Sequence, residues 1–376
     1  MHPVQMVDTR RQYLKIKNEV DAAIHEVIDS SVFIGGKVVD EFASNLAQYN
    51  GSKHVIPCAN GTDALQIALM ALDLRPGDEV ITPSFTYIAT VEVVALLRLK
   101  PVFVDVDAKT YCINPQAIED AITPKTKVII PVHLYGHAAN MEQIMQIAEK
   151  HNISVIEDNA QAIGCDFMFT DGTTKKTGSI GKIGCTSFYP SKNLGCYGDG
   201  GAIFTSDDAL AIKLKMIANH GQAKRYYHDL VGCNSRLDAI QAAVLNIKLK
   251  HLDSYITARR KAADFYDKTF KSFSNVTVPF RAAYGRHVFH QYTLLLEGIN
   301  RDELVKYLSE FNIPSMIYYP VPCHKQKMFN AEGGQNFDLQ VTGWLTDKVI
   351  SLPMHTELDD DQLDFIVNKI VDFLNL

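Results

Sequence analysis

The chain has 376 residues, of which 47% are hydrophobic and 21% charged, the balance of an ordinary globular protein. Its formal net charge of -6 excludes a broad basic surface for nucleic acid. Seven cysteines without CxxC spacing disfavour a disulfide framework, so we expect reduced thiols in a cytoplasmic protein. The opening segment is too polar for a signal peptide, and no apolar run approaches the roughly 20 residues of a membrane span. We therefore expect neither a nucleic-acid partner nor a membrane partner.

Short β-branched runs alternate with helical patterns from about residue 54 onward. The expected strands are 54–59, 79–83, 101–105, 128–131, 154–157, 185–189 and 201–205. Helices are expected from 61 to about 72, from 89 to 97, around 144–148 and over 207–219. This alternation predicts an α/β fold whose mostly parallel sheet is covered by helices on both faces.

The pattern changes in the last third of the chain. A long helix is expected over 236–270, followed by a strand over 290–297 and helices over 301–311 and 359–373. We predict a large domain over residues 1–250, with an N-terminal helical segment, and a smaller α+β domain over residues 251–376. Ligands of open α/β sheets bind beyond the carboxyl ends of the strands, so the polar residues there are candidates for chemistry.

One lysine, Lys192, follows a strand and precedes the glycine-rich segment 198–201. At that place it can reach into a cleft, bind an aldehyde cofactor as a Schiff base and then carry protons. An exposed loop lysine is the commoner meaning of such a segment by itself. Asp158, at the end of an earlier strand, can pair with the protonated pyridine nitrogen of pyridoxal phosphate (PLP). A buried aspartate that caps a helix is the open alternative.

Two further strand ends carry candidate cofactor contacts. Gly61 and Thr62 lie where a strand gives way to a helix, whose free N–H groups and dipole suit a phosphate. An ordinary role as N-cap or first-turn residue is the alternative for Thr62. Tyr87 follows the next strand, where its ring can stack on a planar cofactor or simply pack in the core. The joint occurrence of these residues on successive strand ends favours a PLP site.

These residues closely resemble the DegT–DnrJ–StrS family of PLP-dependent sugar aminotransferases. The matching segments span nearly the whole chain: 59–69 (ANGTDALQIAL), 77–97, 100–107, 132–136, 157–164 (EDNAQAIG), 187–205 (SFYPSKNLGCYGDGGAIFT), 234–243 (NSRLDAIQAA), 318–326 and 351–355. The resemblance implies PLP-dependent transferase fold type I, like aspartate aminotransferase. It also implies a seven-stranded large-domain sheet and a homodimer with shared active sites.

Carried over by position, the resemblance implies Lys192 as the Schiff-base lysine and Asp158 as the partner of the pyridine nitrogen. The other implied cofactor contacts are Gln161 near the ring, Tyr87 stacked on it, Gly61, Thr62 and Ser187 at the phosphate, and Asn234 from the other subunit. One position departs from the family, because Asn159 stands where an alanine is usual. The departure puts substrate-side detail in doubt rather than PLP binding.

Within the family, segments 59–66, 185–205, 220–222 and 225–228 are most similar to the branch that aminates UDP-2-acetamido-2-deoxy-3-oxo-glucuronate for surface-polysaccharide (O-antigen) precursors. The resemblance implies that nucleotide sugar as substrate and glutamate as amino donor. Arg236 is the candidate for the sugar carboxylate, because a guanidinium binds a carboxylate bidentately. A salt bridge with Asp238 is its alternative. Tyr319 and His324 match positions of the sugar-nucleotide pocket, and Phe33 is a candidate nucleotide contact.

Three rival functions stay open. The first is an aminotransferase for a dTDP-3-oxo-6-deoxyhexose. The second is a sugar dehydratase of the same family, a branch with histidine at the lysine position, which Lys192 opposes. The third is a non-catalytic PLP-binding or regulatory protein, which would leave Lys192, Asp158 and Gln161 together unexplained. No metal site is expected, because the histidines do not form a ligand cluster in sequence.

Overall fold

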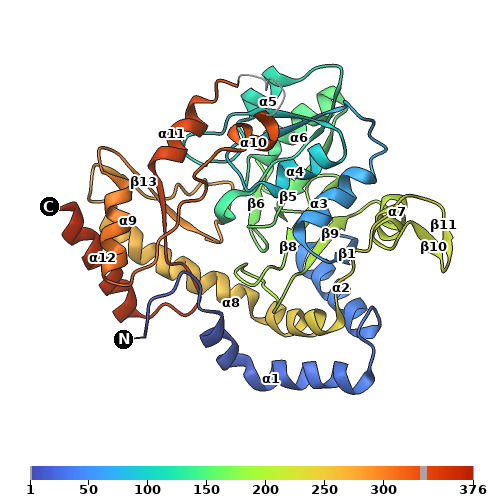
Figure 1. The fold of residues 1–376 in the computed structure, drawn as a ribbon, viewed down its shortest axis with the longest axis horizontal. Coiled ribbons are helices and arrows are strands. Elements are labelled where there is room, and N and C mark those ends of the chain that lie inside the picture. The colour runs from blue at the N-terminus through green and yellow to red at the C-terminus, as the bar shows by residue number, and fades with distance from the viewer. Residues whose placement is uncertain (1, 331–336, 376) are drawn as a thin grey trace.

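A seven-stranded sheet lies at the centre of the computed structural model, which describes residues 2–330 and 337–375 (Figure 1). The strand order is β1-β9-β8-β5-β4-β2-β3. The neighbours from β8 to β3 pair in parallel, whereas β9 is antiparallel to both β1 and β8. The strands are β1 (His54–Cys58), β2 (Glu79–Pro83), β3 (Lys100–Val104), β4 (Thr126–Ile129), β5 (Ser154–Asp158), β8 (Ile183–Ser187) and β9 (Gly201–Thr205). The predicted α/β fold with a mostly parallel seven-stranded sheet is confirmed.

Helices cover both faces of this sheet, because successive strand residues point to opposite sides. Val80 and Val128 belong to a buried cluster with α3, α4 and α7. The next residue of each strand, Ile81 and Ile129, belongs to a cluster with α2, α5, α6 and α8. These helices are α2 (Lys37–Asn50), α3 (Gly61–Met70), α4 (Ala89–Leu96), α5 (Pro115–Ala121), α6 (Met141–His151), α7 (Asp208–Ala218) and α8 (Ala239–Phe270). The carboxyl ends of the central strands are therefore the open edge on which a site can be built.

The C-terminal part has its own antiparallel sheet and its own core. Strands β12, β13 and β14 pair in that order, and their buried face packs against α9, α12 and the end of α8. Helix α8 continues without interruption across the predicted boundary between residues 250 and 251, so it connects the two cores (Figure 1). The division into two domains at that boundary stays a prediction. The elements are β12 (Val276–Thr277), β13 (Tyr292–Leu296), β14 (Val349–Leu352), α9 (Arg301–Glu310), α11 (Gln340–Lys348) and α12 (Asp360–Leu374).

The N-terminal helix α1 runs along α8 and buries Ile16 and Val20 against Val244 (Figure 1). A hairpin of β10 and β11 projects beyond α7 at the edge of the molecule (Figure 1). Among the described residues, no helix has both the length and the apolar character that a membrane crossing requires. The remaining elements are α1 (Thr9–Ser30), η1 (Leu134–Gly136), β6 (Asp166–Met168), β7 (Thr174–Lys176), β10 (Gln222–Lys224), β11 (Tyr227–His228), η2 (Cys323–Lys325) and α10 (Lys327–Asn330).

The strand before the lysine is displaced from its predicted position. It was expected over 185–189 but spans Ile183–Ser187, so it ends two residues earlier. The apolar run that continues through Phe188 is typical of a strand, but Phe188 belongs to the loop and is buried against Phe42 of α2. The shift matters because it places Ser187 at the carboxyl end of the strand, with its hydroxyl at the open edge.

Candidate active site

Five of the predicted site residues come from four strand ends and lie in one region at the carboxyl edge of the sheet. We call Gly61, Tyr87, Asp158, Ser187 and Lys192 the strand-end cluster. Gly61 follows β1, Tyr87 follows β2, Asp158 ends β5, Ser187 ends β8 and Lys192 lies in the loop after β8. Contacts tie these ends together, because Thr90 at the start of α4 donates a hydrogen bond to Asp158 across 2.7 Å.

Asp158 is the buried acid of the cluster, with 5% of its surface exposed. Its Oδ2 accepts the Thr90 hydroxyl, and its Oδ1 accepts the backbone N–H of Ala160 across 3.1 Å. Burial raises its pKa, and the hydrogen bond from Thr90 opposes this shift by favouring the carboxylate. Among the described residues Asp158 has no ion-pair partner within 4.0 Å, although the nearby charge of Lys192 also favours its ionised form. A cationic group brought by a ligand would complete this site.

A second acid behind Asp158 is fully satisfied by the protein. Glu157 accepts the backbone N–H groups of Gly178, Ile180 and Gly181 at 2.6–2.7 Å, and it accepts His133 Nε2 across 2.9 Å. The other nitrogen of His133 accepts the Ala139 N–H across 3.1 Å. Because every strong partner here is protein, Glu157 has a structural role that Asp158 does not share.

Lys192 faces this acid from the loop after β8. Burial lowers the pKa of its amine to about 8, and the nearby charge of Asp158 partly opposes that shift. Within the part of the chain that the structure describes, the Lys192 amine makes neither a hydrogen bond nor an ion pair. Its own backbone N–H is fixed by the Tyr189 carbonyl across 2.8 Å. The result is a fixed lysine whose amine is free to react and is neutral in a large fraction of molecules near pH 8.

A close-packed cradle forms between β1, β8 and β9 beside the N-terminus of α3. A Cβ on Gly61 would lie 2.7 Å from the Ser187 Cβ, and a Cβ on Gly201 would lie 2.4 Å from the Asn60 carbonyl oxygen. Asn60, rather than Thr62, is the N-cap residue, since its side chain accepts the Asp63 N–H across 2.8 Å. Thr62 is therefore not the N-cap, but it lies in the first turn of α3, as the other part of that alternative has it. The free N–H groups at this helix start and the Ser187 hydroxyl can together bind an anion.

Gln161 and Tyr319 connect the cluster to the C-terminal part. The Gln161 amide accepts the Tyr135 N–H across 2.7 Å and donates to the Tyr319 hydroxyl across 2.9 Å. The ring of Tyr319 lies 6.1 Å from the ring of Tyr87, which is 56% exposed and able to contact a ligand. The sequence analysis missed Tyr135 and Thr90, because contacts from a neighbouring element carry no local sequence signal.

His324 does not present a free imidazole. Its Nδ1 lies 2.6 Å from the Ser84 hydroxyl, and its backbone N–H also contacts that oxygen at 3.1 Å. The residue is 8% exposed, and its ring lies 6.3 Å from the ring of Phe103. Burial lowers the pKa of this histidine, so it is neutral at physiological pH. It anchors the segment after Tyr319 to the end of β2.

The other three predicted residues lie at the surface, and we call Phe33, Asn234 and Arg236 the exposed trio. Phe33 is 46% exposed, and its carbonyl accepts the Ala239 N–H at the start of α8 across 2.9 Å. Asn234 and Arg236 are exposed, and within the described ranges neither side chain makes a hydrogen bond or ion pair. The alternative salt bridge between Arg236 and Asp238 is therefore not formed, and the structure does not bring the trio into contact with Lys192.

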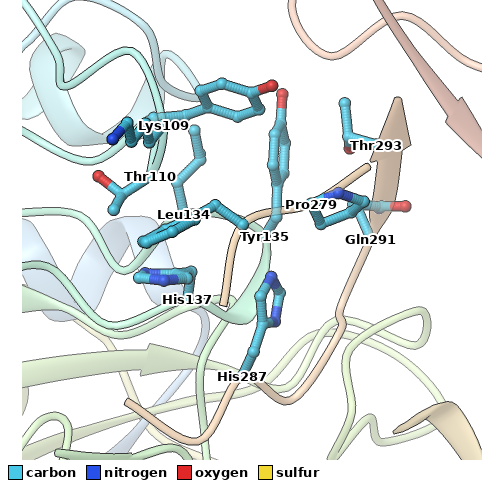
Figure 2. Close-up of a pocket in the computed structure, with 11 residues that line it drawn as sticks. Lys109, Thr110, Leu134, Tyr135, His137, Pro279, His287, Gln291 and Thr293 are labelled. Carbon is cyan, nitrogen blue, oxygen red and sulfur yellow. The ribbon is translucent and has the colours of Figure 1, made fainter. Parts of the chain in front are cut away.

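A small cavity lies behind the site, lined by Tyr135, His137, His287 and Gln291 among others (Figure 2). Its volume of about 10 Å³ is that of a single water molecule. His137 is satisfied by the Ala138 carbonyl and the Ala282 N–H, and burial lowers its pKa to about 4. The cavity is thus too small for a substrate and is lined by neutral, structural histidines. Among the described residues no group of three or more His, Cys, Asp or Glu side chains is placed to hold a metal ion.

Comparison with known proteins identifies the family. Residues 14–371 match the model of the DegT/DnrJ/EryC1/StrS aminotransferase family. The chain belongs to this family. It is a PLP-dependent sugar aminotransferase, and the predicted family, activity and cofactor are confirmed.

Three relatives and one solved structure are similar to this chain over nearly their whole length. UDP-2-acetamido-2-deoxy-3-oxo-D-glucuronate aminotransferase of Pseudomonas aeruginosa is 45% identical, over 96% of this chain and 98% of that protein. UDP-N-acetyl-3-dehydro-alpha-D-glucosamine 3-aminotransferase of Acidithiobacillus ferrooxidans is 44% identical, over 98% and 97%. A pleiotropic regulatory protein of Geobacillus stearothermophilus is 45% identical, over 98% of each. The structure of DesV of S. venezuelae matches with a TM-score of 0.95 at 36% identity and covers 100% of both chains.

Proposed function

We propose that Lys192 holds PLP covalently and that Asp158 pairs with the pyridine nitrogen. The observation that carries the proposal is the free Lys192 amine, its pKa lowered to about 8, facing a buried carboxylate that has no ion-pair partner among the described residues. The close packing at Gly61 and Gly201 holds the start of α3 against Ser187, and the free N–H groups there with the Ser187 hydroxyl fit a phosphate. The donor set therefore fits the cofactor: an amine, an acid and an anion site.

The remaining contacts follow from the same arrangement. Thr62 and Ser187 bind the phosphate together with Gly61, and Tyr87 lies against the ring. Gln161 is held by the Tyr135 N–H, and its other end donates to Tyr319. The amide is therefore oriented before any ligand binds, which reduces the cost of ordering it.

When bound, PLP supplies an electron sink for charge on the carbon next to the reacting nitrogen. The neutral Nζ of Lys192 accepts the proton that leaves the α-carbon of the amino donor. In the second half of the reaction, Lys192 delivers a proton to the sugar carbon that becomes the amine carbon. Asp158, whose charged form the hydrogen bonds from Thr90 and Ala160 favour, would pair with the cationic ring nitrogen.

The amino acceptor in our proposal is UDP-2-acetamido-2-deoxy-3-oxo-glucuronate, and glutamate is the amino donor. The two sugar aminotransferases at 45% and 44% identity carry UDP sugars with a 3-oxo group in their names, and their sugars differ at C6. A uronate has a carboxylate there, whereas a glucosamine has a hydroxymethyl group. The exposed, unpaired guanidinium of Arg236 favours the carboxylate.

The exposed trio also bears on the assembly. We propose a homodimer in the cytoplasm in which Asn234 reaches the phosphate of the partner's cofactor. In its own subunit the segment is fixed at Ser235, whose hydroxyl accepts the Ala59 N–H across 3.1 Å. The side chains of Asn234 and Arg236 on either side of that anchor point to solvent in a single chain. A partner subunit would explain why these polar side chains have no protein contact.

A half-reaction separates the candidate substrates. The enzyme carrying the amino form of its cofactor is offered a panel of UDP-3-oxo-uronate, UDP-3-oxo-N-acetylglucosamine and a dTDP-3-oxo-6-deoxyhexose. We expect the fastest return of the lysine-bound absorption band with the uronate. A faster return with the dTDP sugar would replace the proposed substrate while leaving the aminotransferase chemistry intact.

A regulatory function is the second candidate, favoured by the relative named as a pleiotropic regulatory protein. The strand-end cluster argues for catalysis, because a regulator that only binds PLP has no need of an unpaired lysine and acid. Mass spectrometry of the sugar product settles the matter. Formation of the amino sugar at a rate proportional to enzyme concentration supports catalysis, and its absence with every sugar of the panel contradicts it.

A further inference from the structure

A fully buried lysine, Lys248 of α8, has no part in the proposed chemistry. It is 1% exposed, and burial lowers its pKa to about 8. Among the described residues it has no carboxylate partner. Its amine donates a hydrogen bond to the Gly195 carbonyl and lies 5.3 Å from the centre of the Tyr197 ring. A buried lysine without an acid is costly, so its single strong contact needs an explanation.

The same face of α8 holds the loop at a second point. Gln241 lies seven residues before Lys248, two helical turns along the same face. Its Oε1 accepts the Tyr197 N–H across 2.8 Å, and its Nε2 donates to the Tyr197 carbonyl across 3.4 Å. Two side chains of one rigid helix thus hold the backbone of residues 195 and 197.

The loop between Lys192 and these contacts is tightly closed. A Cβ on Gly195 would lie 2.5 Å from the Pro190 carbonyl oxygen, so this turn admits only glycine without a shift of the backbone. The Cys196 N–H bonds the Phe188 carbonyl across 2.8 Å, and Asn193 donates to the Val288 carbonyl across 3.0 Å. Because Gly195 is three residues from Lys192 in a closed turn, holding its carbonyl restricts where Lys192 can lie.

We propose that Lys248 and Gln241 are positioning residues for Lys192, acting through the backbone of Gly195 and Tyr197. This inference rests on the proposed function, in which Lys192 binds the cofactor. Helix α8 thereby fixes the reactive amine from outside the site and without touching the cofactor.

Loss of this support has a defined consequence for the Lys192 amine. The groups that act on its charge are Asp158 at the end of β5 and His290 from the segment before β13. Cys196 and Arg259 act on Lys248 itself. Release of Gly195 would let water reach the Lys192 amine, and its pKa would move back toward the ordinary lysine value because desolvation is the main cause of its lowering.

The test uses the full chain, freed of its cofactor and then mixed with PLP while the lysine-bound absorption band appears. The rate depends on the neutral amine, so its pH midpoint reports the pKa of Lys192. We expect K248M to raise that midpoint and to slow uptake at pH 7.5 about tenfold, as one pKa unit requires. K248R keeps a donor for the Gly195 carbonyl and should restore most of the rate.

Two further variants and a melting temperature distinguish positioning of Lys192 from a purely structural role of Lys248. K250M removes an exposed lysine of the same helix and should leave the midpoint unchanged. Q241L removes the second contact and should shift the midpoint in the same direction as K248M. A merely structural role would lower the melting temperature of K248M while the midpoint stays at the wild-type value, and that outcome overturns the inference. Failure of the wild-type chain to form the band would instead overturn the proposed role of Lys192.

Discussion

The strand-end cluster and the exposed trio differ in how complete they are within one chain. Asp158 is buried and Lys192 is half-buried, both are held by named contacts, and their pKa values are shifted in opposite directions. Arg236 and Asn234 are exposed and have no side-chain partner among the described residues. The strand-end cluster is therefore preorganised for its ligand, whereas the exposed trio offers side chains that no protein contact orients.

The difference follows from where the two regions lie in the fold. Parallel strands bring their carboxyl ends together, so residues that are far apart in sequence meet without help from another molecule. The exposed trio lies around the start of α8, where the backbone is held at Ser235 and at the Phe33 carbonyl, but the side chains of Asn234 and Arg236 have no partner among the described residues. The residues proposed for the reaction are therefore positioned within one chain. The residues proposed to select the substrate need a ligand or a partner subunit to become ordered.

The largest effect is expected at Lys192. Replacement by alanine (K192A) removes both the covalent attachment and the proton carrier, so turnover should fall by at least about 10³-fold. The lysine-bound absorption band should disappear as well. K182A is a suitable control, since Lys182 lies in a turn before β8 and its side chain makes no hydrogen bond within the described residues. Persistence of the band in K192A would place the attachment on another lysine.

The second largest effect on activity is expected at Asp158. In D158N the amide cannot offer a negative charge to a cationic ring nitrogen, so kcat should fall by roughly 10²–10³-fold. Cofactor attachment should persist because Lys192 is intact, which separates this variant from K192A. The measurement is the single-turnover rate with glutamate at saturating cofactor. A kcat within a few-fold of the wild type would mean that Asp158 is a buried structural acid, as Glu157 is.

Most of the fold and part of the site could be predicted from sequence, for a physical reason. Short buried strands that are flanked by turn residues are recognisable as short apolar runs, so 79–83 and 201–205 were placed at their observed bounds. The strand before Lys192 was misplaced because Phe188 is apolar for packing and not for pairing. The contacts of Lys248 and Thr90 could not be predicted, because a helix residue that reaches a distant loop leaves no periodic signal.

Within the exposed trio, replacement of Arg236 is expected to have a smaller effect, and one that is specific to a single sugar. R236M should raise KM for the UDP-3-oxo-uronate by roughly 10- to 100-fold, the range expected for loss of a charge-assisted hydrogen bond. The KM for UDP-3-oxo-N-acetylglucosamine should stay unchanged, because that sugar has no carboxylate at C6. R75M, which removes another exposed arginine, is the matched control. Equal effects of R236M on both sugars would show that Arg236 does not recognise the carboxylate.

The smallest effect on activity is expected at Thr90. It tests whether the Thr90 hydrogen bond favours the charged form of Asp158. In T90V the carboxylate loses a donor that favours its charged form, so its already raised pKa should rise further. Since the ionised acid is the active form, activity should be lost at a higher pH on the acid side of the profile. We expect kcat/KM at pH 6 to fall roughly three- to tenfold, with little change at pH 8.5. T82V is the control, because the buried Thr82 hydroxyl has no hydrogen-bond partner among the described residues. A pH-independent fall in T90V would mean that the hydroxyl only packs against the site, and the charge state of Asp158 would then be set by burial and the cofactor alone.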